Sequence, residues 1–446
     1  MIMKKQSGGY REILRQTQFM KLVAANVVNR LGDALDAVAY TWIVYQVTGS
    51  ASWAALIFGL NQLPTILLLP VAGALVERRN KKRVMVVTDV VRGLITLAFC
   101  LMYMAGLLNG WIIALFTLTI SSVEAFRVPC GKSVLPQLLA EAHYTYGTSV
   151  NSALSTVAEL AGTGLAGVVI ALWGAQVAVL GDVITFFLSA LILATMRVNP
   201  PKVAAERSEP FFRTLSQGFR YVVSRHTIRN LALVAVLINA CAVPLNSFFA
   251  VIVQDVWRQG AELMSAAEVA LTVGALLGSV VYPLVAARMG MQKLLPLFGS
   301  VMALTFVGVA VLGNVSSAAV IWAGALMCFL LLGVCSAICN SGLGVEFMKV
   351  VAPEYLSRAS AILGAMSTAA VPVMSFALSA ACRVVSVEAL LISGGVLFMI
   401  VMGLVVVFHI PLEEPRMERD DDEHDGETRD QLDSGSDEPV GERLFE

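Results

Sequence analysis

The sequence predicts an all-α integral membrane protein with twelve transmembrane helices, arranged as two six-helix bundles that form a pseudo-repeat. Of its 446 residues 57% are hydrophobic and only 14% are charged, whereas a soluble domain carries roughly a quarter charged residues. The chain also contains twelve apolar stretches of about 20 residues, the length that crosses a bilayer. Finally, its two halves align with each other at an offset of 210 residues.

The apolar stretches define the predicted helices in chain order. They are 19–46, 52–76, 83–106, 110–127, 148–172, 176–196, 227–255, 263–287, 292–312, 317–347, 356–381 and 387–410. The first follows a polar segment and has no small-residue cleavage site, so we expect a retained helix rather than a signal peptide.

Lysine and arginine are concentrated in alternate connections. The 78–83 loop and the 197–226 connector are basic, whereas the connections on the other side contain only Arg258 and Arg383. Basic connections remain on the cytoplasmic side of a membrane. We therefore expect a multi-pass protein of the cell (inner) membrane with both termini in the cytoplasm.

Composition divides the chain into five parts. The segment after Pro411 holds 15 Asp/Glu and 4 Lys/Arg, and such a segment cannot bury a core. The expected parts are a cytoplasmic N-terminal segment 1–18, a six-helix bundle 19–196, a cytoplasmic linker 197–226, a second bundle 227–410 and a disordered acidic cytoplasmic tail 411–446.

The internal repeat is weak but spans several elements. Residues 73–83 align with 283–293, which matches Arg78 to Arg288. The same offset places Asn29 over Asn239 and Asp36 over Asn246. Two repeated bundles with a site between them are the plan of a secondary transporter.

The connection after the second span carries a specific signature. Gly73, Glu77, Arg78 and Arg83 follow the spacing of Gly-x-x-x-Asp-Arg-x-Gly-Arg-Lys, and the loop resembles that of the major facilitator superfamily. The resemblance implies the major facilitator fold, with a central cavity and a gating role for this loop. The alternative for the loop is simple positive-inside anchoring.

Other motifs resemble the macrolide-efflux type of drug:proton antiporter. They are Leu31-Gly-Asp33, Tyr40–Val44, Gln46–Ser50, Leu180-Gly-Asp182, Phe186–Ser189 and Pro353–Arg358. The fifth span departs from the antiporter signature, because Gly162-Thr163-Gly-Leu-Ala-Gly167 lacks its proline. The departure weakens the case for antiport and leaves transport unaffected.

The first span carries a polar stripe at spacings of three and four residues, which place its members on one broad helix face: Asn26, Asn29, Arg30, Asp33, Asp36 and Tyr40. Charged side chains in the middle of a membrane span usually face a cavity or a partner. Arg30 and Asp33 are one turn apart and can neutralise each other, which would leave Asp36 free to titrate. Asp33, Asp36 and Glu159 are the candidates for the coupled proton, and Arg30 and Arg92 are further candidates for coupling or substrate binding. The alternative is that Arg30 and Asp33 form a permanent structural pair and that Asp36 contacts water near the outer end of the span.

Two further charged residues lie within predicted spans. Glu159 is midway along the fifth span and could bind a proton or a cationic substrate, or donate an interhelical hydrogen bond as a neutral acid. Arg92 could pair with Asp89 on its own helix, or with Asp33 or Glu124 across helices. A charge network of this kind can switch between conformations when an acid is protonated.

The second half offers fewer polar groups. Asn239, Asn246 and Phe249 are candidates for lining the cavity, beside Pro244, which removes a backbone donor from the helix. A lipid-facing or core role for the aromatic residue is the alternative.

These observations, with the resemblance, predict a proton-coupled secondary active exporter of amphipathic drug-like small molecules that works by alternating access. Its expected partners are the substrate, protons and the lipid bilayer, and we expect a monomer. We find no catalytic motif, cofactor-binding motif, metal cluster or nucleic-acid signature. The alternatives are an exporter or flippase of an endogenous amphiphile (a lysolipid or siderophore), and a non-transporting receptor or scaffold whose acidic tail binds a partner.

Overall fold

Long α-helices make up almost all of the described chain. The computed structural model describes residues 10–77, 79–139, 143–198, 219–220, 222–351, 353–408 and 410–412, and no strand occurs in these ranges. Most of the predicted linker and residues 413–446 lie outside the described residues. So does Arg78 of the predicted gating loop.

The first half contains a short helix and six long ones: α1 (Tyr10–Leu14), α2 (Thr17–Thr48), α3 (Ala51–Glu77), α4 (Lys81–Met104), α5 (Gly110–Leu138), α6 (Tyr144–Trp173) and α7 (Ala175–Thr195). The second half contains six more, one extended by a π-helical segment and one by a 3₁₀ turn: α9 (His226–Val251), η2 (Ile252–Val256), α10 (Ala261–Ala286), α11 (Met291–Val311), η3 (Leu312–Asn314), α12 (Ala318–Val350), α13 (Pro353–Ala381) and α14 (Val387–Val407).

Each predicted span overlaps one of these twelve long helices, which confirms the predicted fold class. Eleven of them are long and apolar enough to cross a membrane within the described residues. The exception is α2, which carries the polar stripe. The fourth predicted span was too short, because α5 continues through Pro129 to Leu138. Arg127 is therefore a helical residue rather than part of a loop.

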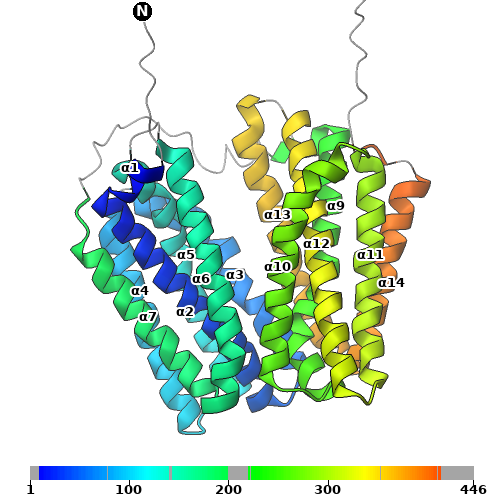
Figure 1. Ribbon diagram of the computed structural model, residues 1–446, viewed down its shortest axis with the longest axis horizontal. Coiled ribbons are helices and arrows are strands. Elements are labelled where there is room, and N and C mark those ends of the chain that lie inside the picture. The colour runs from blue at the N-terminus through cyan, green and yellow to red at the C-terminus, as the bar shows by residue number, and fades with distance from the viewer. Residues whose placement is uncertain are drawn as a thin grey trace, which may run out of the picture.

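The helices form two bundles side by side, with α2–α7 in one and α9–α14 in the other (Figure 1). Corresponding helices begin about 210 residues apart, and the offset is 210 for Ala51 and Ala261 and for Lys81 and Met291. Helix α3 packs on α13 and α6 packs on α10 across the boundary between bundles. Since α3 corresponds to α10 and α6 to α13, the two contacts are related by the repeat.

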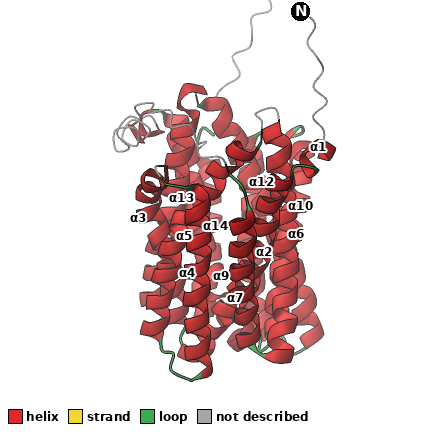
Figure 2. Cartoon of the chain, turned by 90° about the vertical axis from the view of Figure 1, so that its left-hand side faces the viewer, coloured by secondary structure: helices red, strands yellow, loops and turns green. Residues whose placement is uncertain are grey.

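Basic side chains mark one end of the molecule. We call this the basic end: it is where α1 lies and where α4 and α11 begin, with Lys82, Arg83, Arg288 and Lys293. Figure 2 shows the helices running nearly parallel between this end and the opposite end.

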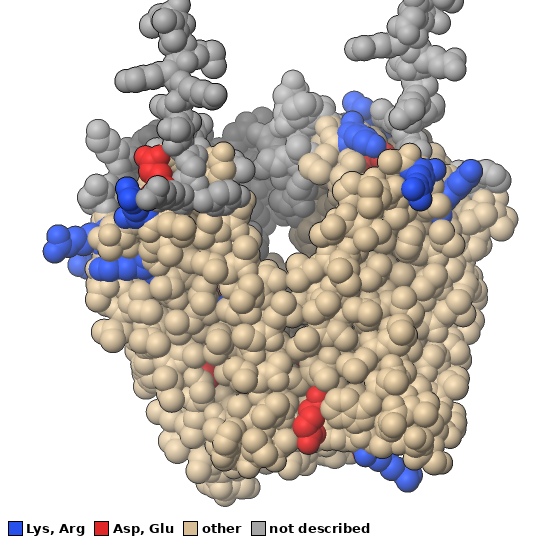
Figure 3. Space-filling view, in the orientation of Figure 1, with Lys and Arg blue, Asp and Glu red and all other residues tan. Residues whose placement is uncertain are grey.

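The bundles touch each other at the opposite end. The Tyr45 hydroxyl donates to Asp255 Oδ2, and the Ser379 hydroxyl donates to the Ser52 carbonyl over 2.8 Å. A third contact joins α6 to α10, where a Cβ at Gly167 would lie 2.5 Å from the Ser265 Cβ. At the basic end a notch separates the bundles (Figure 3). Among the described residues, the hydrogen bonds between the bundles thus lie toward the opposite end, and the hollow lies toward the basic end.

Candidate functional site

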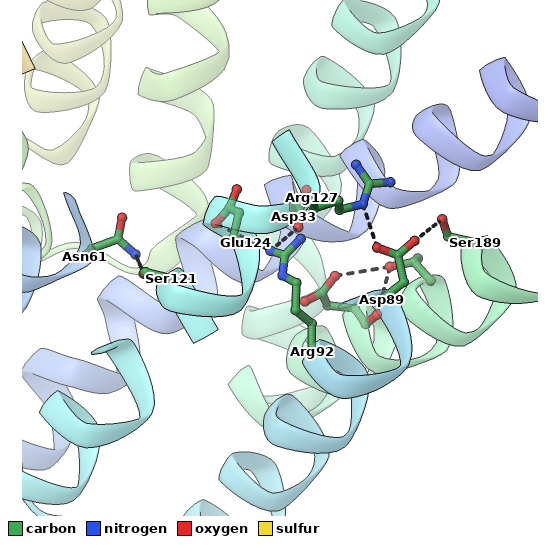
Figure 4. A network of polar contacts seen from close by, with 10 residues as sticks. Asp33, Asn61, Asp89, Arg92, Ser121, Glu124, Arg127 and Ser189 are labelled. Atoms are coloured by element: carbon green, nitrogen blue, oxygen red, sulfur yellow. Dashed lines mark hydrogen bonds and ion pairs between the residues drawn. The ribbon is translucent and has the colours of Figure 1, made fainter. Parts of the chain in front are cut away.

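Charged side chains from three helices of the first bundle, α2, α4 and α5, converge on one region (Figure 4). Arg92 on α4 pairs with Asp33 on α2 at 3.0 Å and lies 3.8 Å from Glu124 on α5. Its guanidinium also lies 4.4 Å from the centre of the Phe186 ring on α7. Of the alternatives open for Arg92, the cross-helix pairing is the one observed, with Asp33 closer than Glu124.

A second network lies behind this one. Asp89 is fully buried, receives a hydrogen bond from Arg127 Nε over 2.5 Å, and receives another from the Ser189 hydroxyl over 2.7 Å. Three helices, α4, α5 and α7, are thereby joined by one carboxylate. Because Asp89 is dry and fully paired, its position indicates a structural role.

The expected pairing of Arg30 with Asp33 was wrong. Arg30 Nη2 lies 2.8 Å from Glu159 Oε2 on α6, and Arg30 Nε donates to the same oxygen over 3.0 Å. Neighbouring helices bring a carboxylate into better geometry for the long arginine side chain than the residue one turn away on α2. Glu159 is therefore partnered, and both side chains remain more than one-third exposed.

Asp36 differs from the other carboxylates of the first bundle. Among the described residues neither a hydrogen bond nor an ion pair reaches it, and its Oδ1 is buried without a partner. Tyr40, one turn further along α2, is satisfied by the Thr117 hydroxyl at 2.6 Å and the Ile113 carbonyl at 3.2 Å. Leaving a buried carboxyl oxygen without a donor costs free energy. This sets Asp36 apart from the buried Asp182, whose Oδ1 accepts from the Thr185 hydroxyl over 3.1 Å.

Two adjoining cavities connect these groups. One of about 380 Å³ is lined by polar residues of α2, α4 and α5, including Asp36, together with Val44, Ile57 and Phe58. The other, of about 420 Å³, is lined by the α2 stripe and by α6, including Asn26, Asn29 and Glu159. Four charged residues line both cavities: Arg30, Asp33, Arg92 and Glu124.

The first cavity also reaches the second bundle. Ser247 on α9 contributes to its lining, and the Ser247 hydroxyl is buried without a partner among the described residues. The cavity is therefore bounded by both bundles, as a site for alternating access requires.

The remaining candidates lie as follows. Asn26 donates to Asn151 on α6 over 3.0 Å, whereas the buried Asn29 amide nitrogen lacks a partner. Asn239 donates to the Ala235 carbonyl of its own helix, and Asn246 is exposed. In the second bundle Phe249 is 5% exposed and stacks on Phe329 at 4.6 Å between ring centroids, which places it in the core rather than in the cavities.

The gating-loop candidates are described only in part. Gly73 and Glu77 belong to the end of α3, and Arg83 is exposed in the first turn of α4. The Arg83 amide donates to the Asn80 side chain over 3.2 Å, which caps α4. The loop thus lies at the basic end, at the side where the bundles are apart.

Sequence reasoning missed several members of the site. Asn61 on α3 donates to Ser121 on α5 over 3.2 Å, and Ser247 and Arg127 were not singled out. Arg127 could have been found, because it lies three residues from Glu124 and shares its helix face. The serines carry no such signal, because a lone hydroxyl in a membrane helix usually bonds its own backbone.

Comparisons with known proteins agree with this architecture. A sequence model of the family described as "Transmembrane secretion effector" matches residues 11–436. Macrolide efflux protein A of Streptococcus pyogenes is 22% identical over 364 residues, which are 80% of this chain and 87% of that protein. Multidrug efflux pump Tap of Mycobacterium tuberculosis is 24% identical over 276 residues, which are 60% of this chain and 65% of that protein.

Among solved structures, the crystal structure of nucleoside transporter NupG has a TM-score of 0.70 to this chain. The alignment covers 88% of this chain and 98% of that one at 10% sequence identity. At this identity the likeness shows the fold alone.

Proposed function

The chain belongs to the transmembrane secretion effector family of the major facilitator superfamily, and we propose that it is a proton-coupled secondary active exporter of amphipathic drug-like small molecules. It works as a monomer by alternating access, without enzymatic activity, in the cytoplasmic membrane. The basic end and both termini face the cytoplasm.

One observation carries the coupling part of the proposal. Asp36 lines a cavity bounded by both bundles, and one of its oxygens is buried without a partner. The other carboxylates that line the two cavities are Asp33 and Glu159, which are ion-paired, and Glu124, which lies near Arg92. Asp36 is therefore the carboxyl whose charge is least compensated, and a proton removes that charge without breaking an ion pair.

The lining also supports the substrate class. Around the first cavity, Asp33, Asp36 and Glu124 outnumber Arg30 and Arg92. The same cavity presents Val44, Ile57 and Phe58, so it offers apolar surface beside an excess of acid. A cationic amphiphile fits both features, and it would compete with the proton for Asp36.

The two bundles, 19–196 and 227–410, rock as units about the cavity. In the conformation described, the contact between Tyr45 and Asp255 holds the opposite end shut. The loop from Gly73 to Arg83 would hold the basic end shut in the other conformation. Each inward proton contributes about 2.3 kcal/mol per 100 mV, which sustains a substrate gradient of roughly 50-fold.

The test is proton flux in proteoliposomes across a panel of cationic, neutral and anionic amphiphiles. We expect a cationic member of the panel to drive proton movement through the wild type. Asp36→Asn should reduce that flux at least tenfold. Glu388→Gln should leave it unchanged, because Glu388 is exposed at the start of α14, away from the cavities.

Two results would contradict the proposal. Full proton flux in Asp36→Asn would remove Asp36 as the coupling group. If an imposed proton gradient has no effect on substrate transport by the wild type, transport is not coupled to protons. The protein would then carry out facilitated transport with the same fold.

A further inference from the structure

A large cavity lies outside the candidate site, at the basic end of the second bundle. It has a volume of about 1020 Å³ and is enclosed by the end of α10, the connection 287–290, the start of α11 and the end of α12. We call it the α10–α12 cavity. It shares no lining residue with the two cavities of the first bundle, so transport chemistry does not account for it.

The walls of the α10–α12 cavity favour an anion. Arg288 is exposed there and has no carboxylate partner among the described residues, and Lys349 is 63% exposed beside its partner Glu346 at 2.6 Å. Glu346 is the single acid of the lining. Lys293, next to the lining residue Gln292, adds an exposed positive charge.

The start of α11 adds to this preference. Its first turn contains no acidic residue, and no side chain caps it. The open amides of a helix N-terminus carry a partial positive charge. Figure 3 shows Lys and Arg gathered over this part of the second bundle.

The described chain ends at the wall of the same cavity. Gln292 donates to the Ile410 carbonyl over 2.8 Å and accepts from the Leu412 amide at 3.3 Å. Leu412 is fully buried, and Asn230 holds the intervening Pro411 carbonyl at 3.4 Å. The residue before the acidic segment is therefore fixed beside Gln292, which lines the cavity.

The segment that follows has the matching charge and sufficient length. Residues 413–446 hold 15 Asp/Glu and 4 Lys/Arg, with four consecutive acids at Asp420–Glu423. Eight extended residues reach up to about 27 Å, and eight residues separate Leu412 from Asp420. Attachment at Leu412 gives the segment an effective concentration in the millimolar range.

We propose that the acidic segment 413–446 docks in the α10–α12 cavity of its own chain, with its carboxylates on Arg288, Lys293 and Lys349. Two described lysines at the basic end of the first bundle are instead engaged with the end of α7, because Lys21 donates to the Thr195 carbonyl and Lys82 to the Ala194 carbonyl. The inference is independent of the transported substrate.

Carbodiimide cross-linking of the full chain in nanodiscs of phosphatidylcholine tests the proposal, because the reagent joins lysine to carboxylate only on contact. We expect links from residues 413–446 to Lys293 and Lys349 at yields at least fivefold above those to Lys21 and Lys82. Because the attraction is ionic, 0.5 M NaCl should lower the yields. Arg288→Glu should lower them at least fivefold, whereas Arg383→Glu, at the opposite end, should not.

Three outcomes would overturn the proposal. Equal yields at lysines of both bundles would mean general attraction to the basic end. Links between ¹⁴N- and ¹⁵N-labelled chains in a mixed sample would mean docking on a second copy. Loss of the links in nanodiscs containing phosphatidylglycerol would mean that an anionic lipid headgroup occupies the cavity.

Discussion

Among the described residues, the membrane helices of the first bundle carry four cross-helix ion pairs, whereas the second bundle holds one ion pair, between Lys349 and Glu346 near the basic end. The interior of the second bundle is instead filled by aromatic side chains, among them Phe248, Phe306 and Phe398. The same backbone plan is thus stabilised by charge networks in one half and by packing in the other.

The chemical difference between the two bundles can be followed at positions that the internal repeat aligns. Asp36, with a buried oxygen that lacks a partner, corresponds to Asn246, which is exposed. Asn29, with an orphaned amide, corresponds to Asn239, which bonds its own helix. The repeat therefore preserves helix positions but not chemistry.

The largest expected effect is loss of the buried ion pair in the first bundle. Arg127→Leu leaves the Asp89 carboxylate, which is fully buried, without its cation. Removing one partner of a buried pair costs about 3–5 kcal/mol. We expect the thermal unfolding midpoint in detergent, followed by fluorescence-detected size exclusion, to fall by at least about 5 °C.

The double variant Arg127→Leu/Asp89→Leu provides the control, since replacing both partners by apolar groups removes the unpaired charge. It should recover most of the lost stability. A double variant as unstable as the single one would mean that helix packing, rather than charge, decides the stability at this position.

The corresponding test of the second bundle removes an aromatic ring. Phe249→Ala deletes the stack on Phe329 and leaves a cavity in a closely packed region. Truncating a buried phenylalanine costs about 3 kcal/mol. The same unfolding assay should show a clear loss of stability, whereas Phe408→Ala, with 70% of the residue exposed, should change little. Equal effects of both variants would contradict the division into a charged and a packed half.

A smaller effect is expected where the two bundles meet. Tyr45→Phe removes the hydroxyl that donates to Asp255. Because water can reach the exposed Asp255, the loss is about 1 kcal/mol, which is roughly a fivefold shift toward the conformation that is open at the opposite end. A cysteine replacing Thr41, which lines the cavity, should react about fivefold faster with an impermeant maleimide added at the opposite end.

Tyr103→Phe is the matched control for this measurement. Tyr103 also bonds at the opposite end, to Gln46 over 3.0 Å, but both residues belong to the first bundle. Its loss should leave the labelling rate unchanged. If both variants accelerated labelling alike, the rate would report local fraying and not separation of the bundles.

The architecture could be predicted from sequence because its signals are long and repeated. Apolar spans, basic connections and the offset between halves gave helix positions within a few residues, except at α5. There the helix continues through Pro129, although a proline favours a helix end. A helix that packs on neighbouring helices tolerates a proline. The sequence alone does not show which helices will be neighbours, so this extension could not be predicted.

The sequence predicted which residues belong to the candidate site, but it did not predict which of their side chains pair with each other. The spacing along α2 marked the residues that face the cavities, whereas it suggested Asp33 as the partner of Arg30. The actual partner, Glu159, lies 129 residues away on α6. Which side chains meet depends on how helices cross, and Arg92 had three acids within plausible reach for the same reason.

The smallest expected effect separates exposed from buried charge within the first bundle. Arg30 and Glu159 form a close pair, yet their side chains are 48% and 37% exposed, so each can be hydrated when the other is absent. Such pairs contribute about 0–1 kcal/mol. Arg30→Gln should therefore shift the unfolding midpoint far less than Arg127→Leu, in the same assay and detergent. A shift of equal size would mean that lipid or substrate, rather than water, surrounds this pair in the folded protein. The two cavities would then not be filled with water.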